Sequence, residues 1–203
     1  GRTWKVAING VNRDAYFGDT GNNNDRANLL GLSLKPWRTQ GSHILIAGQH
    51  DKSLQWENMP RMSTWVMQTI EELKKHTDRS IYFRPHPRCR LLTIESQYKN
   101  VYRQDPQLVT GTYDDYDINF KDAWATISHS SNPGIQSIIN GVPAFVSSSS
   151  LAYPVANNID SLQNIEDPVI PDRQQWLNDY AHTEYTTEEI SKGIPHKRLT
   201  SLL

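Results

Sequence analysis

Short apolar runs alternate along this chain with segments of helical periodicity. The apolar runs have the length and composition of buried strands, and they cover residues 43–48, 81–83, 123–127 and 142–146. Residues 62–76 carry apolar side chains at helical spacing, and so do residues 135–140, which end at Gly141, a residue that often closes a helix. Alternating strands and helices predict an α/β fold, a Rossmann-like parallel sheet covered by helices.

Both ends of the chain follow a different pattern. Residues 4–8 could form an opening strand, residues 9–24 form a long polar loop that is either a mobile lid or, more commonly, a plain surface loop, and residues 29–37 fit a strand or turn. Residues 175–180 and 187–190 fit short amphipathic helices, the second capped by Thr186 or Thr187. We therefore divide the chain into an N-terminal strand and loop segment, residues 1–40, and a Rossmann-like domain with C-terminal helices, residues 41–203.

Composition and charge argue against several classes of protein for this chain. The 203 residues carry a formal net charge of −1, which argues against a broad nonspecific grip on nucleic acid but not against a local basic groove. No apolar run approaches a membrane span, and residues 1–5 do not resemble a secretory signal. The single cysteine, Cys89, excludes an internal disulfide and fits a reducing compartment. We expect a soluble, cytoplasmic protein without a membrane partner.

The first candidate for chemistry is the segment Arg84-Pro-His-Pro-Arg88, which follows the run at 81–83. Ligands of open α/β sheets bind at the carboxyl ends of the strands. The two prolines hold the backbone extended, so Arg84, His86 and Arg88 can face a ligand in the crevice, and arginine forks suit phosphate oxygens. The alternative is that the arginines are solvated loop charges and His86 is a packed core histidine.

The second candidate is the segment from His129 to Gly134, which precedes the helix predicted at 135–140. Ser130, Ser131 or Asn132 would cap that helix, and Pro133 suits its first turn. A helix start presents free N–H groups and partial positive charge to an anion, and Gly134 admits close approach of a ligand. An ordinary capped helix explains the same residues. Taken together, the two segments predict a phosphate-binding cleft for a nucleotide-linked substrate.

A third polar turn, residues 49–53, follows the strand predicted at 43–48 and would share the same edge of the sheet. We count Gln49 and Ser53 among the ligand-binding candidates.

Several of these motifs together resemble a known family. They comprise residues 34–38, 44–49, 83–87, 130–134 with 141–143, and 175–179. They resemble the bacteriophage and bacterial glycosyltransferases that are related to capsule-polysaccharide Kdo transferases, and the resemblance covers most of the chain from about Ile8 onward. It implies a GT-B architecture of two Rossmann-like halves, of which this chain matches the C-terminal, donor-binding half. It also implies that His86 and Pro87 hold the phosphate of a nucleotide-sugar donor, with Ser130 and Ser131 holding it from the helix start.

The chain departs from that family in one respect. A GT-B enzyme usually has a further N-terminal half that supplies much of the acceptor site, and here only residues 1–32 precede the matching pattern. We expect either a fragment or a minimal form whose acceptor site lies in a partner subunit.

Sugar transfer needs stabilisation of the leaving phosphate and, in an inverting enzyme, a base for the acceptor hydroxyl. Arg84, His86, Arg88 and Ser131 would meet the first need. For the base we choose Asp51, at the same edge of the sheet; Asp114, Asp115 and Asp117 are the alternatives, although an acidic cluster is as often a solvated turn. We expect no essential metal, despite the one-residue spacing of Asp115 and Asp117, and no cofactor beyond the nucleotide sugar, for which a UDP-sugar is one candidate.

The sequence does not identify the molecule that accepts the sugar. The family resemblance favours 5-hydroxymethylpyrimidine in phage DNA, and a capsule or lipopolysaccharide glycan competes with it. A basic groove of Arg38, Lys52, Arg61 and Arg88 would favour DNA. A non-catalytic module that binds nucleotide sugars, or a hydrolase or epimerase of such compounds, fits the same cleft.

Overall fold

The computed structural model describes residues 3–18, 24–89, 91, 93–112 and 115–200. The chain divides into two compact units. Unit 1 combines residues 1–34 with residues 171–203, and unit 2 is the continuous stretch 35–170. Each unit is described below by itself.

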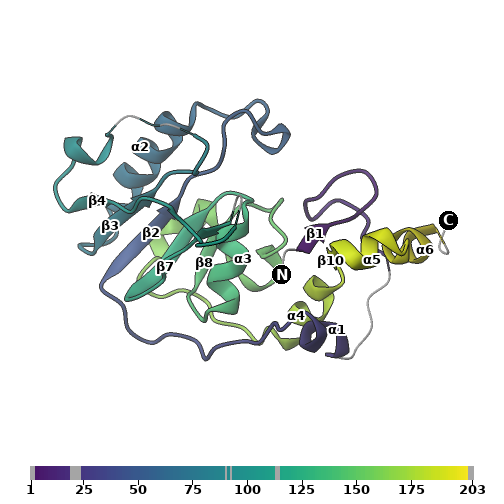
Figure 1. Ribbon diagram of the computed structural model, residues 1–203. Helices are drawn as coiled ribbons and strands as arrows, with labels where there is room; N and C mark the ends of the chain where they lie inside the picture. Colours follow the sequence, from purple (N-terminus) through teal and green to yellow (C-terminus); the bar gives the residue numbers. More distant parts are fainter. Residues whose placement is uncertain (1–2, 19–23, 90, 92, 113–114, 201–203) are drawn as a thin grey trace. The chain divides into compact units, whose positions relative to one another are not determined.

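Unit 2 is built on a six-stranded parallel sheet (Figure 1). Its strands in chain order are β2 (His43–Ala47), β3 (Ser80–Arg84), β4 (Val101–Arg103), β7 (Ala123–Ser128), β8 (Ala144–Val146) and β9 (Asn157–Asn158). They lie in the order β4-β3-β2-β7-β8-β9, with β2 paired in parallel to both β3 and β7. This is the strand order of Rossmann folds, with its switch point between β2 and β7. The predicted α/β, Rossmann-like class is confirmed.

The remaining elements of unit 2 connect these strands. They are the helices α2 (Met62–Leu73) and α3 (Asn132–Ile139), the antiparallel pair β5 (Gln107–Leu108) and β6 (Tyr116–Asp117), and the 3-10 turns η1 (Leu54–Trp56), η2 (Glu95–Gln97), η3 (Tyr153–Val155) and η4 (Ile159–Asn164). The predicted helices at 62–76 and 135–140 are thus present. Ser131, one of the three caps expected for the second helix, is the N-cap residue of α3, and Pro133 lies in its first turn.

Apolar side chains on both faces of β2 form the core of unit 2. Ile44 and Ile46 belong to one buried cluster with Ile70 of α2, and Leu45 belongs to a second cluster with Val142. All five residues of β2 are buried, as expected for a central parallel strand covered on both faces.

A glycine sets the distance between α3 and the sheet. A Cβ atom at Gly134 would lie 2.9 Å from Cγ1 of Val146 in β8, so only glycine permits this packing. The sequence reading gave Gly134 a different role, close approach of a ligand. Val146 of β8 fills the space next to the Cα atom of Gly134, and Gly134 does not line the cavity of the candidate site.

Unit 1 joins the two ends of the chain. Strand β1 (Thr3–Lys5) pairs antiparallel with β10 (Glu184–Thr186), and the unit also contains α1 (Asp25–Leu29), α4 (Gln174–Ala181), α5 (Thr187–Ser191) and α6 (Ile194–Thr200). Thr186 caps α5 in a capping box with Glu189, which confirms one of the two caps predicted.

An arginine holds the two segments of unit 1 together. Arg26 of α1 donates from Nη1 to Oε1 of Glu189 at 2.7 Å and from Nε to the carbonyl of Ala181 at 2.8 Å, and it lies over the Tyr185 ring. The hydrogen bonds from Arg26 lower the pKa of Glu189 to about 2. These contacts lie between residues more than 150 positions apart in the chain.

The observed division differs from the one drawn at residue 40. Residues 171–203 group with the N-terminal segment, because β10 and Glu189 supply the partners of β1 and Arg26. The strand expected at 4–8 is restricted to the three residues that pair with β10. Of the strand or turn expected at 29–37, a turn is present at residues 30–31; residue 29 ends α1, and residues 32–37 are irregular backbone. Among the described residues, no helix is long and apolar enough to cross a membrane.

Candidate functional site

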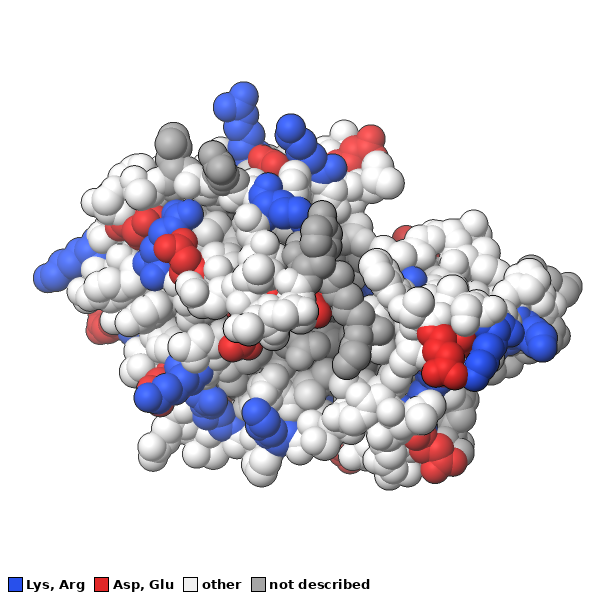
Figure 2. Space-filling model, in the orientation of Figure 1, with Lys and Arg blue, Asp and Glu red and all other residues white. Residues whose placement is uncertain are grey.

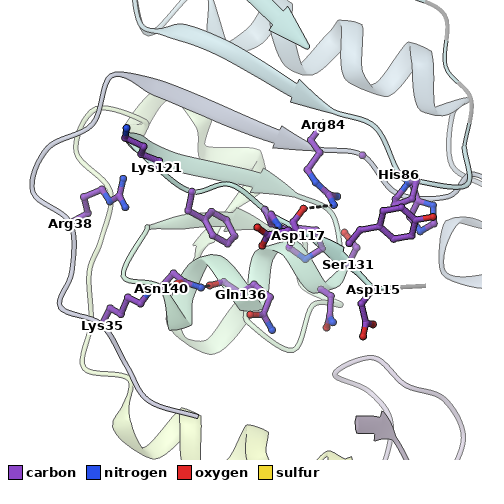
Figure 3. A pocket seen from close by; sticks show the side chains of 17 residues that line it. Lys35, Arg38, Arg84, His86, Asp115, Asp117, Lys121, Ser131, Gln136 and Asn140 are labelled. Atoms are coloured by element: carbon purple, nitrogen blue, oxygen red, sulfur yellow. Dashed lines mark hydrogen bonds between the residues drawn. The ribbon is translucent and has the colours of Figure 1, made fainter. Parts of the chain in front are cut away.

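A cavity of about 840 Å³ opens in unit 2 beside the carboxyl ends of β2 and β3 and the start of α3 (Figure 3). Its walls come from three places: Gly48 after β2, the segment that begins at Arg84 of β3, and residues 115–121, which include β6. The N-terminal end and one side of α3 complete it. The cavity therefore lies where ligands of open α/β sheets bind.

Arg84 is the most deeply buried charged group of this cavity. The residue is only 4% exposed, and its Nη2 donates to the main-chain carbonyl of Asp117 at 3.1 Å. Its Nε is buried and has no hydrogen-bond partner within the described part of the chain. Burial lowers the pKa of Arg84, and the charge of Asp117 opposes that shift. A buried guanidinium at the cavity lining is suited to an anionic ligand, because such a ligand would offset the solvation and the charge balance lost on burial.

His86 presents a hydrogen-bond donor at the same wall. Its Nδ1 accepts the main-chain N–H of Arg88 at 3.1 Å, so in the neutral ring the proton resides on Nε2. The ring also lies edge-on to His50, with 5.4 Å between centroids. Both His86 and Pro87 line the cavity. In a neutral ring, Nε2 of His86 therefore carries the proton and acts as a donor, not as an acceptor.

Helix α3 begins at the cavity. Ser131 is its N-cap residue with extended backbone, and the Ser131 hydroxyl bonds to Oγ of Ser128 at 2.9 Å in place of capping the helix. Ser131, Asn132 and Pro133 line the cavity. The positive end of an eight-residue helix therefore lies near the same space as Arg84 and His86.

Gln49 and Ser130 support the cavity from behind. The Gln49 side chain is 4% exposed, and its Oε1 accepts the main-chain N–H of Ser130 at 3.3 Å and its hydroxyl at 3.2 Å. The residue before Ser130, His129, packs edge-on against Trp56, and burial lowers the pKa of His129. Neither Gln49 nor Ser130 lines the cavity, so these two predicted ligand contacts are not part of its wall.

Three predicted site residues lie away from the cavity lining. Ser53 caps the turn η1 by accepting the N–H of Gln55, and Arg88 is exposed. Asp51, chosen as the catalytic base, accepts from the thiol of Cys89 at 3.7 Å and lies 3.8 Å from Nδ1 of His50. Burial raises the pKa of Cys89. The structure thus brings Arg84, His86, Ser131 and Asn132 together and leaves Asp51 outside their cavity.

Two of the alternative carboxylates do line it. Asp115 and Asp117 are in the wall that includes β6, and Asp114 lies outside the described residues. Among the described residues no group of three or more side chains is arranged to hold a metal ion.

Further polar residues of the cavity were not identified from the sequence. Gln136 and Asn140 are four positions apart on or just after α3, so helical spacing places them on one side. Lys35 donates to Oδ1 of Asn140 at 2.7 Å. The helical spacing was a usable signal for Gln136 and Asn140. Lys35 lies in the motif at residues 34–38 but was not chosen as a site residue, and Lys121 comes from a loop without a signal.

The lining carries more positive than negative charge. Lys35, Arg38, Arg84 and Lys121 face the two carboxylates of Asp115 and Asp117. Of the four residues proposed for a basic groove only Arg38 lies here; the remaining three, Lys52, Arg61 and Arg88, are elsewhere. On the face shown in Figure 2, basic and acidic side chains are interspersed.

Comparisons with known proteins add no assignment to this geometry. The chain was compared with models of protein families, with curated proteins and with solved structures, and nothing matched in any of the three.

Proposed function

We propose that this chain is a glycosyltransferase that binds the phosphate of a nucleotide-sugar donor in the cavity of unit 2 and moves the sugar to a hydroxyl acceptor. The observation that carries the proposal is the convergence of the buried Arg84 guanidinium, the His86 ring and the start of α3 on one cavity. A Rossmann-like sheet whose strand order reverses beside this cavity supports it, because that is where such sheets bind nucleotides.

The polar groups fit the charge that develops during the reaction. When the glycosidic bond to phosphate breaks, the leaving oxygen gains negative charge, which Arg84, the Nε2–H of His86 and the N–H groups of α3 can stabilise. Nucleotide binding alone would need the same groups. The proposal of sugar transfer, of a GT-B-like donor half and of a cytoplasmic enzyme comes from the motif resemblance described above.

The acceptor that we propose is 5-hydroxymethylpyrimidine in phage DNA, with a capsule or lipopolysaccharide glycan as the competing acceptor. In either case the acceptor hydroxyl must reach the sugar in the cavity.

Calorimetric titration with UDP-glucose, GDP-mannose, CMP and dTDP-glucose tests the donor site. We expect one nucleotide series to bind to wild type and to bind at least about tenfold more weakly to Arg84→Gln, the loss expected for a charge-assisted contact. Arg61→Gln, an exposed arginine outside the cavity, is the matched control. Absence of binding by every nucleotide would contradict the proposal.

Incubation of the bound donor with a duplex containing 5-hydroxymethylcytosine, and separately with a capsule oligosaccharide, then tests transfer. Mass increase of one acceptor by one sugar is the expected result.

A second function, nucleotide-sugar binding without catalysis, is favoured by the position of Asp51, the predicted base, outside the cavity. Tight donor binding without product on either acceptor would support it.

A further inference from the structure

We propose that Asp117, not Asp51, is the base that takes the proton from the acceptor hydroxyl. This inference rests on the proposed function and names a residue for its chemical step.

Asp117 is held at the anion-binding part of the cavity. It is the last residue of β6, and its main-chain carbonyl accepts the hydrogen bond from Nη2 of Arg84 at 3.1 Å. Oδ1 of Asp117 accepts the N–H of Ile118 at 2.9 Å, which orients the carboxylate and leaves Oδ2 for another partner. The residue is exposed and lines the cavity, so water or an acceptor can reach it. Figure 3 shows the hydrogen bond between Arg84 and the main chain of Asp117 as a dashed line.

The buried charge of Arg84 indicates that this part of the cavity suits an anionic group. The residue is 4% exposed and lines the cavity, so an anionic group bound beside it would offset the solvation that the guanidinium has lost. Asp117 lines the same cavity.

Two other carboxylates compete for the role. Asp115 lies on the same wall, but the residue that accepts the hydrogen bond of Arg84, through its main-chain carbonyl, is Asp117. Asp51 contacts the Cys89 thiol outside the cavity. Asp117 is therefore the carboxylate that combines access to the cavity with proximity to the phosphate-binding guanidinium.

In the proposed step, the acceptor oxygen attacks the anomeric carbon of the donor and forms the new glycosidic bond while its proton passes to Oδ2 of Asp117. The bond from the anomeric carbon to the phosphate oxygen breaks, and its electron pair leaves with the nucleotide, whose charge is held by Arg84 and His86. Asp117 later releases the proton to water.

The test compares Asp117→Asn with Asp115→Asn and Asp51→Asn. In Asp117→Asn the side-chain amide keeps an oxygen for the Ile118 N–H, and the main-chain carbonyl stays bonded to Arg84, so the fold and the donor site are preserved. Each variant is assayed for affinity for the donor that wild type binds, and for kcat with whichever acceptor wild type glycosylates, the 5-hydroxymethylcytosine duplex or the oligosaccharide.

We expect Asp117→Asn to lower kcat by roughly 100-fold or more, in the range of general base catalysis, with donor affinity within about threefold of wild type. The acidic limb of the wild-type pH profile of kcat should disappear in this variant, a change that a merely structural role would not produce. Asp51→Asn should keep kcat within about threefold of wild type, since its carboxylate contacts the Cys89 thiol outside the cavity. Asp115→Asn, in the cavity lining, should lose less kcat than Asp117→Asn and keep the acidic limb of the pH profile.

Wild-type kcat in Asp117→Asn, or an equal loss in Asp115→Asn or Asp51→Asn, would overturn the assignment while leaving the transferase intact. A wild-type chain that binds the donor and glycosylates neither acceptor would overturn both the assignment and the transfer chemistry. A chain that binds no nucleotide would remove the proposed function at its first step.

Discussion

Gln49 and Ser130 link the two strands between which the order of the sheet reverses. Oε1 of Gln49, just after β2, accepts both the N–H and the hydroxyl of Ser130, just after β7. These two hydrogen bonds hold the ends of the two strands together. They require a side chain as long as that of glutamine with an acceptor at its tip.

Replacement of Gln49 by leucine should therefore destabilise unit 2. Two buried donors of Ser130 would lose their acceptor, at a cost of about 1–3 kcal/mol in the free energy of unfolding. Urea denaturation measures this loss. Gln49→Glu keeps an acceptor oxygen at the same position and is the control for the hydrogen bond; equal stability of wild type and Gln49→Leu would show that the link contributes nothing.

The tautomer of His86 can be observed directly. Because Nδ1 accepts the N–H of Arg88, we expect the Nδ1 resonance of a neutral ring to show an unprotonated nitrogen and the Nε2 resonance a protonated one in ¹⁵N NMR. Nucleotide binding should shift Nε2 more than Nδ1. A proton on Nδ1 at neutral pH would refute the proposal that Nε2–H is the hydrogen-bond donor of a neutral His86 ring.

The side chain of His86 should also contribute to affinity. We expect His86→Ala to weaken binding of the nucleotide by about 1–3 kcal/mol, the cost of removing one hydrogen bond to a charged group. Calorimetry measures the change, and His76→Ala, on a histidine paired with Glu72 outside the cavity, should bind as wild type does.

Unit 1 should lose stability in acid through Glu189. Its pKa in the folded protein is about 2, below the ordinary value of 4.5, because Arg26 stabilises the carboxylate. A depressed pKa stabilises the fold above the unfolded value, so this contribution is complete above about pH 4.5 and is lost as pH falls toward 2.

Unfolding of wild type and Glu189→Gln between pH 2 and pH 6 checks this pH dependence. The variant should be less stable at pH 6, and the difference should shrink as pH falls. Glu188→Gln is the control, since the ion pair of Glu188 with Lys192 is largely exposed and should contribute little. A difference that stays constant with pH would contradict the role of the Glu189 charge.

The packing of α3 on β8 can be tested with two substitutions, of which the second removes the clash that the first creates. Gly134→Ala should destabilise unit 2 by about 1–3 kcal/mol, because the added Cβ would meet Cγ1 of Val146 at 2.9 Å. Val146→Ala removes that methyl group, so the double variant should be more stable than the sum of the two single losses predicts. Additive losses in thermal unfolding would show that the contact does not limit this position.

Much of unit 2 was predictable because its strands are buried on both faces. Residues 44–47 are apolar without interruption, and the glycine and proline residues around residues 132–141 mark both ends of α3. The cluster of Arg84, His86 and Ser131 followed from one rule, that the carboxyl ends of parallel strands share an edge.

The opposite wall of the cavity could not be predicted in this way. Strands β5 and β6 have two residues each, too few for a periodic signal, and their pairing fixes where Asp117 lies. Asp51 follows β2, whose carboxyl end lies at the cavity, but the turn after β2 brings the Asp51 side chain to Cys89. The sequence pattern does not indicate the direction of that side chain. The pairing of β1 with β10 involves three residues at each end of the chain, so the division into two units also had no local signal.

The pairing of β1 with β10 also sets an order of events during synthesis. Every strand of the central sheet lies between residues 43 and 158, so this sheet can form while the remainder of the chain is still being translated. Strand β1 precedes every strand of that sheet in the chain yet has to wait for β10, and Arg26 has to wait for Glu189. These residues, although translated before the sheet, are therefore among the last to reach their native structure.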